Sequence, residues 1–311
     1  MSDLRQTYTS SDTTPHSGGG TPDELVPSRY AVRVGEIDVL VISDGVFALP
    51  AETLATNVDR ADLAAWLRNN LLPTDIFTWP LNVLVVRSGD QTILVDSGAG
   101  LEFPDIPGVG RLASRLEAAG IDPASLTDVV LTHLHVDHVG GLLADGLRGR
   151  LGRDVPIHLA AAEARFWASP DFSQNSFGGF PDVLQSAEER FVDMYRSQLR
   201  PFEAEYEVAP GVIARCTGGH TAGHSVVRMA SGGDRLTFLG DAVFPNHFDH
   251  PEWHNAFDHD PEEAVLVRER LLRDLATTGE PVVAAHLPFP SVGRVAAAGD
   301  AFRFITATWD H

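Results

Sequence analysis

The sequence predicts a mixed α/β sandwich in which helices cover both outer faces of the sheets. Four short apolar runs each end abruptly at an acid or a histidine, and they span residues 92–96, 129–133, 237–241 and 282–286. Segments with helical spacing of apolar residues lie between these runs. Short turns such as 87–90 join many neighbouring runs, which favours mixed sheets over a purely parallel sheet.

The four apolar runs predict strands. Each of the four is short and largely apolar, as expected of a buried strand. Layered α/β folds build their sites from polar groups at the C-terminal ends of such strands, so the acids and histidines predict a site there. Further strands are expected at 37–43, 82–87, 155–159, 212–216 and 225–229.

Helix signals separate these strands. Asp260 is placed as an N-cap, Pro261 follows at the first helical position, and two glutamates then favour the positive end of the helix dipole. Apolar residues continue at helical spacing from Ala264 to Leu275. Further helices are expected at 60–71, 110–119, 187–199 and 295–307.

Composition excludes several classes of function. The chain has 311 residues, 23 basic and 43 acidic side chains, and a net charge of −20. A field of that sign repels phosphate backbones and anionic lipid, so we expect no nucleic-acid partner and no membrane partner. No apolar stretch approaches the ~18 residues of a membrane span. The single cysteine, Cys216, excludes a disulfide framework and a metal cage of thiolates.

The first 28 residues differ from the rest. They are rich in Ser, Thr, Gly and Pro, and they lack the basic start and apolar run of an export signal. We therefore expect residues 1–28 to form a disordered tail and residues 29–311 to form one domain of a cytoplasmic protein.

The segment 132–141 carries the strongest chemical signal. It reads Thr-His-Leu-His-Val-Asp-His-Val-Gly-Gly. His133 and His135 are two residues apart, so both point the same way in an extended segment. Asp137 and His138 are adjacent and diverge, so they can serve a second centre nearby. Imidazole and carboxylate together suit zinc and other first-row metals.

This pattern resembles the signature of the metallo-β-lactamase superfamily. Asp96 in Val-Asp-Ser-Gly-Ala-Gly matches the upstream motif of that family, and the segments 219–224, 240–244 and 285–290 match the later ones. The resemblance covers nearly everything after the tail. It implies the αββα sandwich of that superfamily, a fold of the α/β (α+β) class.

The resemblance also implies a binuclear metal centre. One ion would be held by His133, His135 and His220, the other by Asp137, His138 and His286, and Asp241 would bridge them. Two divalent ions are expected per chain, zinc first, with manganese, cobalt or iron as alternatives. A bridging hydroxide would cleave an ester, lactone or phosphotriester. Asp137 and Asp241 are then catalytic as ligands, and Asp96 is expected to orient a ligating histidine.

Details of the motifs narrow the branch. Asp241 stands where some β-lactamases place a cysteine, and His135 replaces the glutamate of the redox di-iron branch. Three segments, 42–47, 251–264 and 286–290, are similar to the methyl parathion hydrolase-like branch, and quorum-quenching lactonases are close to it. The alternatives are an acyl-homoserine lactone lactonase, a mononuclear-iron persulfide dioxygenase-like oxidoreductase and a non-enzymatic scaffold.

Aromatic residues predict an apolar pocket for a small uncharged ester-like substrate. The candidates for contact with the substrate are Phe77, Trp79, Trp167, Phe177, Phe244 and His247. The lactonase branch typically has a tyrosine where this chain has Phe244, which favours activated aryl esters or phosphotriesters as substrates. The four histidines between residues 247 and 259 are expected along the cleft or at a contact between subunits. The chain is a possible homodimer.

The tail hypothesis leads to a truncation experiment. A chain that begins at Ser28 should keep the melting temperature and the turnover of the full chain, because the tail buries too little apolar area to offset its ordering entropy. Differential scanning calorimetry and a hydrolysis assay on both chains provide the measurement. A large loss in either quantity would show that the tail docks on the domain.

Overall fold

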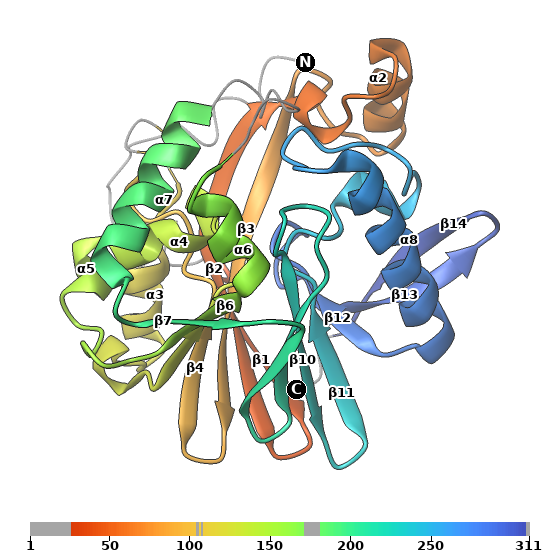
Figure 1. Cartoon of the computed structure of the whole chain (residues 1–311). Coiled ribbons are helices and arrows are strands. Elements are labelled where there is room, and N and C mark those ends of the chain that lie inside the picture. The colour runs from red at the N-terminus through yellow and green to blue at the C-terminus, as the bar shows by residue number, and fades with distance from the viewer. Residues whose placement is uncertain (1–25, 104–105, 107, 171–180, 309–311) are drawn as a thin grey trace, which may run out of the picture.

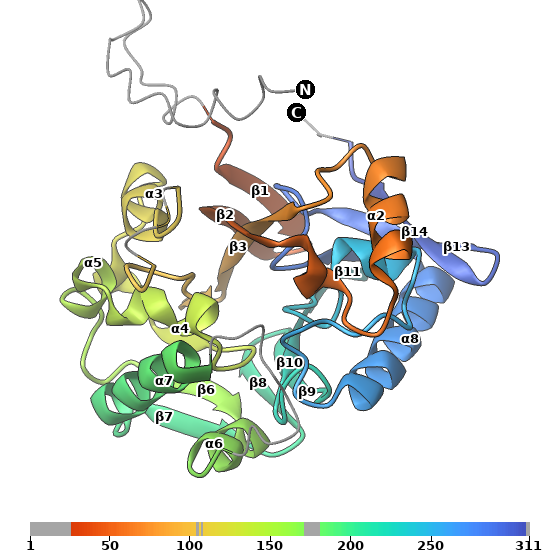
Figure 2. The same ribbon diagram turned by 90° about the horizontal axis from the view of Figure 1, so that it is seen from above.

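Two seven-stranded sheets stack face to face, and helices cover their outer faces (Figures 1 and 2). The structure is a computed structural model, and it describes residues 26–103, 106, 108–170 and 181–308. Both sheets contain parallel and antiparallel pairs. The predicted sandwich of mixed sheets is therefore confirmed.

The first sheet has the strands in sequence order: β1 (Arg29–Val34), β2 (Ile37–Pro50), β3 (Ile76–Ser88), β4 (Gln91–Val95), β5 (Asp128–Val130), β6 (Ile157–Ala160) and β7 (Leu199–Phe202). Its β1 to β4 half is antiparallel. From β4 to β7 the strands are parallel, so their carboxyl ends meet at one edge.

The second sheet runs in the order β14-β13-β12-β11-β10-β9-β8. Its strands are β8 (Glu205–Ala209), β9 (Val212–Cys216), β10 (Ser225–Ser231), β11 (Asp234–Phe238), β12 (Pro281–Val283), β13 (Gly293–Ala298) and β14 (Ala301–Thr306). Only the pair of β11 and β12 is parallel among the described strands of this sheet. These two strands therefore end side by side.

The helices divide between the two outer faces (Figure 2). On the first sheet lie α3 (Leu112–Ala118), α4 (Val136–Leu143), α5 (Asp145–Arg148), α6 (Ala161–Trp167) and α7 (Pro181–Tyr195). On the second lies α8 (Pro261–Thr278), with α2 (Arg60–Asn69) above it in Figure 1. Short 3₁₀ turns occupy Ala51–Leu54, Pro123–Ser125 and Pro245–Phe248.

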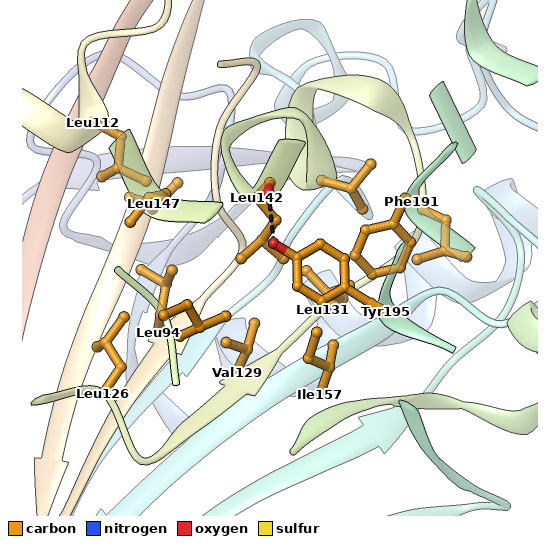
Figure 3. Packing of buried hydrophobic residues seen from close by; sticks show 14 of the residues in the cluster. Leu94, Leu112, Leu126, Val129, Leu131, Leu142, Leu147, Ile157, Phe191 and Tyr195 are labelled. Atoms are coloured by element: carbon orange, nitrogen blue, oxygen red, sulfur yellow. Dashed lines mark hydrogen bonds between the residues drawn. The ribbon is translucent and has the colours of Figure 1, made fainter. Parts of the chain in front are cut away.

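Apolar side chains fill the space between each pair of layers. Figure 3 shows the cluster under the helices of the first sheet, where Phe191 and Tyr195 of α7 lie over Val129 and Ile157. The hydroxyl of Tyr195 donates to the carbonyl of Leu142 at 2.6 Å, which ties α7 to α4. A second cluster lies between the two sheets, and a third lies under α8.

Two expected helices differ from the structure. Residues 295–307 form the hairpin of β13 and β14 instead of a helix, because Gly299 takes a left-handed conformation and turns the chain with Asp300. The expected helix 187–199 begins earlier and ends at Tyr195, and Leu199 starts β7. In both places a tertiary strand pairing overrides a helical spacing of apolar residues.

Within the described ranges, none of the helices combines the length and the apolar character that crossing a bilayer demands.

Candidate metal centre

The ends of neighbouring strands position the candidate ligands. Asp96 follows β4, and the loop after β5 carries His133 and His135 before α4 begins. In the second sheet, Asp241 follows β11 and His286 follows β12. The site therefore forms where the carboxyl ends of parallel strands meet, as the sequence predicts.

The first group of candidate ligands consists of three histidines. His133, His135 and His220 each offer a ring nitrogen, and these atoms lie within 4.8 Å of one another. Nδ1 of His135 is 3.1 Å from Nε2 of His220. All three side chains are buried.

The second group lies beside the first. Asp137, His138 and His286 bring their ligand atoms within 4.8 Å of one another. Oδ2 of Asp137 is 3.6 Å from Nε2 of His138 and 3.4 Å from Nε2 of His286.

Asp241 stands between the two groups. Its Oδ2 is 3.5 Å from Nε2 of His220 in the first group and 3.0 Å from Nε2 of His286 in the second. Its Oδ1 is 3.2 Å from Nε2 of His138. One carboxylate therefore reaches both groups, which is the arrangement required of a bridging ligand.

The donor set fits divalent cations. Nε2 of His133, Nε2 of His138 and Oδ1 of Asp241 are buried and form no hydrogen bond in the described part of the chain. Unsatisfied polar atoms of this kind are costly inside a protein. A divalent ion with nitrogen and carboxylate ligands would satisfy all three.

The charges of the site also favour cations. Burial disfavours the charged form of His286, but Asp241 and Asp137 outweigh burial and raise its pKa to about 10. Burial alone would likewise lower the pKa of His138, yet the neighbouring carboxylates raise it well above its ordinary value. In the first group burial dominates and lowers the pKa of His133 far below its ordinary value. The carboxylates thus attract positive charge to the second group.

Each candidate histidine has a partner for its other ring nitrogen. Nδ1 of His138 lies 2.8 Å from Oδ2 of Asp96, and Nδ1 of His286 lies 2.8 Å from the carbonyl of Pro80. The remaining pairs are His133 Nδ1 with Thr132 Oγ1 at 3.0 Å, His220 Nδ1 with Asp258 Oδ1 at 2.9 Å, and His135 Nε2 with His259 Nε2 at 3.1 Å. Such contacts fix the orientation of a ligating ring.

Asp96, which contacts His138, has a strained backbone. Its φ of 59° is in the left-handed region, which non-glycine residues rarely occupy. Oδ1 of Asp96 accepts from the backbone N–H of Thr132 at 2.8 Å, and Oδ2 accepts from the Thr132 hydroxyl at 2.8 Å. The side chain thus contacts both His138 and the strand end that precedes His133. The structure places Asp96 where the sequence analysis expects a residue that orients a ligand.

A buried ion pair supports Asp258. Arg268 of α8 is fully buried, and its Nη2 lies 3.1 Å from Oδ2 of Asp258. The same guanidinium donates to the carbonyls of Ala242, Pro251 and Trp253. Arg268 therefore connects the loop after Asp241 to the residue that holds His220. The sequence analysis missed Arg268. Its place among the apolar residues of the helix predicted from Ala264 to Leu275 was the available signal that this cation is buried.

Three further described histidines, His224, His247 and His259, contact residues at or near the candidate ligands. Nε2 of His224 accepts from the backbone N–H of Asp241 at 3.0 Å, so this ring supports the loop of the bridging candidate. Nδ1 of His247 accepts from the N–H of Phe244 at 3.1 Å. His259, which the sequence analysis expects along the cleft or at a subunit contact, lies against His135, with the two Nε2 atoms 3.1 Å apart.

An apolar cavity opens onto the candidate ligands. Its volume is about 90 Å³. Four of its lining residues are His135, Asp137, Asp241 and His286, and the others are Phe47, Leu49, Trp79, Phe103, Ile106, Val136, Phe244 and Phe257.

Two of the six residues that the sequence analysis expects to contact the substrate line this cavity. Trp79 and Phe244 line this cavity, and their rings meet edge to face at 5.0 Å. Phe77 and His247 do not line the cavity. The ring of Phe77 packs edge to face against Trp79, and Nδ1 of the buried His247 accepts from the backbone N–H of Phe244. Trp167 lines a different cavity and donates its indole N–H to Glu163. Phe177 lies outside the described residues.

Comparisons with known proteins also indicate a metal-dependent hydrolase. The family model described as "Metallo-beta-lactamase superfamily" matches residues 77–286. A protein named N-acyl homoserine lactonase from Bacillus sp is 23% identical over 238 residues, which cover 70% of this chain and 84% of the relative.

Two solved structures resemble the fold over most of its length. AidC, described as a dizinc quorum-quenching lactonase in complex with a product, superposes with a TM-score of 0.83 at 24% identity, covering 91% of this chain and 99% of AidC. The hydrolase AbOPH superposes with a TM-score of 0.81 at 25% identity, covering 92% of this chain and 99% of AbOPH. At this identity the likeness to AidC shows the fold alone.

The geometry of Asp241 predicts metal content. The purified chain should hold about two divalent ions, and Asp241→Ala should lose most of the bound metal and most of the activity, because it removes the group that reaches both sets of nitrogens. Elemental analysis after dialysis against zinc provides the measurement. Asp128→Asn, which changes an acid paired with His158 away from the site, is the control and should keep both ions. One ion or none in the unmodified chain would contradict the prediction.

The Arg268 pair predicts a loss of stability. Arg268→Met should lower the free energy of unfolding by about 3–5 kcal/mol, because it leaves the buried carboxylate of Asp258 without its ion partner. Urea unfolding of the metal-free chain measures the loss. Arg273→Met breaks an exposed pair on the same helix and should cost less than about 1 kcal/mol. Equal effects of the two substitutions would refute the role assigned to Arg268.

Proposed function

The chain belongs to the metallo-β-lactamase superfamily and is a metal-dependent hydrolase, and we propose that it cleaves small, uncharged, apolar esters, lactones or phosphotriesters at a two-metal centre. His133, His135 and His220 would hold one ion, and Asp137, His138 and His286 the other, with Asp241 shared. Zinc is the first choice for both ions, because nitrogen and carboxylate ligands in this number suit it.

One observation carries the choice of substrate. The cavity that opens onto the ligand set is lined by eight apolar residues, and its only polar lining residues among those described are four candidate ligands. Such walls stabilise an apolar group by burial, and outside the candidate ligands the indole N–H of Trp79, which forms no hydrogen bond within the described residues, is their one polar group. A neutral substrate with an aromatic or alkyl body fits these walls.

Different residues of the chain have different roles in the proposed hydrolysis. Divalent ions at the site would lower the pKa of water and polarise the scissile carbonyl or phosphoryl group. Phe47, Trp79 and Phe244 exclude bulk water and hold the apolar body of the substrate. Asp96 and Asp258 keep His138 and His220 oriented throughout.

Phe244 limits the range of substrates. Its ring stacks on His286 with the planes 17° apart, so it lies beside a candidate metal ligand but has no hydroxyl to donate to a bound substrate. None of the described residues that line the cavity has a hydroxyl. A missing donor to a developing oxyanion costs on the order of 3 kcal/mol. Substrates with good leaving groups tolerate this loss best, so activated aryl esters and aryl phosphotriesters are the preferred class.

A second candidate function is lactone hydrolysis. The relative from Bacillus sp is named an N-acyl homoserine lactonase, and it aligns over 84% of its length. The apolar cavity also suits an acyl chain. This similarity favours acyl-homoserine lactones as the alternative substrates at the same centre.

A substrate panel separates the two candidates. The zinc-loaded chain should show a higher kcat/KM for an aryl ester or aryl phosphotriester than for a long-chain acyl-homoserine lactone. Phe244→Tyr should raise kcat/KM for the lactone by roughly tenfold or more relative to the aryl ester, because it adds a donor beside His286. Steady-state kinetics on both substrates measure the ratio.

Phe103→Tyr is the matched control. It adds a hydroxyl on the cavity wall at a ring that packs on Phe47, and it should leave the ratio of the two kcat/KM values within about threefold of the unmodified chain. A lactone that is the best substrate of the unmodified chain would move the lactonase function to first place. No hydrolysis of any ester, lactone or phosphotriester would refute the proposed function.

A further inference from the structure

Glu163 is a fully buried acid that lies outside the candidate ligand set. It is on α6, and no local pattern in the sequence singles it out. A buried carboxyl group is expensive unless its oxygens are satisfied. The partners of Glu163 therefore indicate what it does.

Four hydrogen bonds satisfy its two oxygens. Oε1 accepts from the backbone N–H of Leu134 at 3.0 Å and from the indole N–H of Trp167 at 2.9 Å. Oε2 accepts from the hydroxyl of Thr221 at 2.7 Å and from the backbone N–H of Gly223 at 2.8 Å. One oxygen thus serves the segment 133–138, and the other serves the segment 219–224.

The partners are placed next to the candidate ligands. Leu134 lies between His133 and His135, and Thr221 directly follows His220. These three histidines form the first group, although His220 follows His133 and His135 by 87 and 85 residues. Glu163 connects the two loops through a single rigid carboxylate.

The close approach at Gly223 is a second, independent sign of this connection. A Cβ atom at Gly223 would lie 2.1 Å from the backbone nitrogen of Glu163 and 2.6 Å from its Cβ. Real atoms do not approach so closely, so the loop 219–224 reaches Glu163 only because residue 223 is glycine. The backbone of Gly223 has no left-handed φ that would otherwise call for glycine.

We propose that Glu163 is a positioning residue that sets the distance between the loop of His133 and His135 and the loop of His220. The inference rests on the proposed metal centre but not on the identity of the substrate. It predicts that loss of Glu163 weakens the first ion selectively, because the second group of ligands makes no contact with this carboxylate.

The conservative substitution Glu163→Gln is the sharpest test. In either orientation of the amide, its NH₂ group faces two donors. The Thr221 hydroxyl can turn and accept, but the N–H groups of Leu134, Trp167 and Gly223 cannot. At least one donor is then left facing another donor, while the volume of the side chain is unchanged.

Glu188 supplies a matched control. It is a second buried acid, its two oxygens have no hydrogen-bond partner within the described ranges, and it lines the same cavity as Trp167. Burial raises the pKa of Glu188 well above its ordinary value. Glu188→Gln therefore removes a buried carboxyl nearby without breaking a hydrogen bond to any described residue.

The experiment measures metal binding on the full chain. Zinc stoichiometry is determined by elemental analysis, stepwise affinity by competition with a chelator, and site geometry by the absorption spectrum of the cobalt-loaded chain. Glu163→Gln should weaken one of two ions about 10- to 100-fold and change the cobalt spectrum, whereas the other ion stays within about twofold of the unmodified chain. Glu188→Gln should keep both affinities and the spectrum.

The outcomes separate this inference from the proposed function. If the unmodified chain does not hold two ions, the proposed centre itself fails. If it holds two and Glu163→Gln holds both with unchanged affinity, or weakens both equally, the positioning role is overturned. If Glu163→Gln does not fold, Thr221→Val, which removes one donor, decides instead: weakening of one ion alone supports the role, and unchanged binding of both overturns it.

Discussion

Five buried imidazole rings have to turn one nitrogen each towards the same small volume, and the surrounding fold serves that orientation. A ring is fixed when its second nitrogen is held, and the holding groups come from different parts of the chain. Asp96 follows β4, Pro80 is in β3, and Asp258 precedes α8. The site therefore exists only when both sheets and their connections are in place.

The same requirement explains the two glycines that close the central motif. A Cβ at Gly140 would lie 2.2 Å from the carbonyl oxygen of Ala99, and one at Gly141 would lie 1.9 Å from that of Ser97. The second half of α4 thus packs directly on the loop that contains Asp96. Because α4 also carries Asp137 and His138, this contact sets the distance between those ligands and the carboxylate that orients His138. The close packing at the two glycines and the orientation of His138 by Asp96 therefore depend on the same contact between α4 and the loop.

The sequence predicts what local pattern can encode. The spacing of His133, His135 and Asp137 and the polar ends of apolar runs are visible without a structure, and they led to the sandwich and to a site at the strand ends. Long-range partners carry no such local signal. Glu163 and Asp258 contact their histidine loops only after folding. The segment 295–307 shows the opposite error, since its apolar spacing suits a helix but pairing of β13 with β14 decides its structure.

The charge of the molecule bears on the release of product as well as on the binding of substrate. Hydrolysis of a neutral ester, lactone or phosphotriester produces an anion. The lining of the cavity contains no Arg among the described residues, and its carboxylates Asp137 and Asp241 belong to the ligand set. The chain as a whole carries a net charge of −20. Apart from the divalent ions that the proposed function requires, the described lining offers an anionic product only the indole N–H of Trp79, and the field of the protein opposes its return. Under the proposed function, the apolar walls therefore favour the neutral substrate over the charged product, whose binding depends on the metal ions.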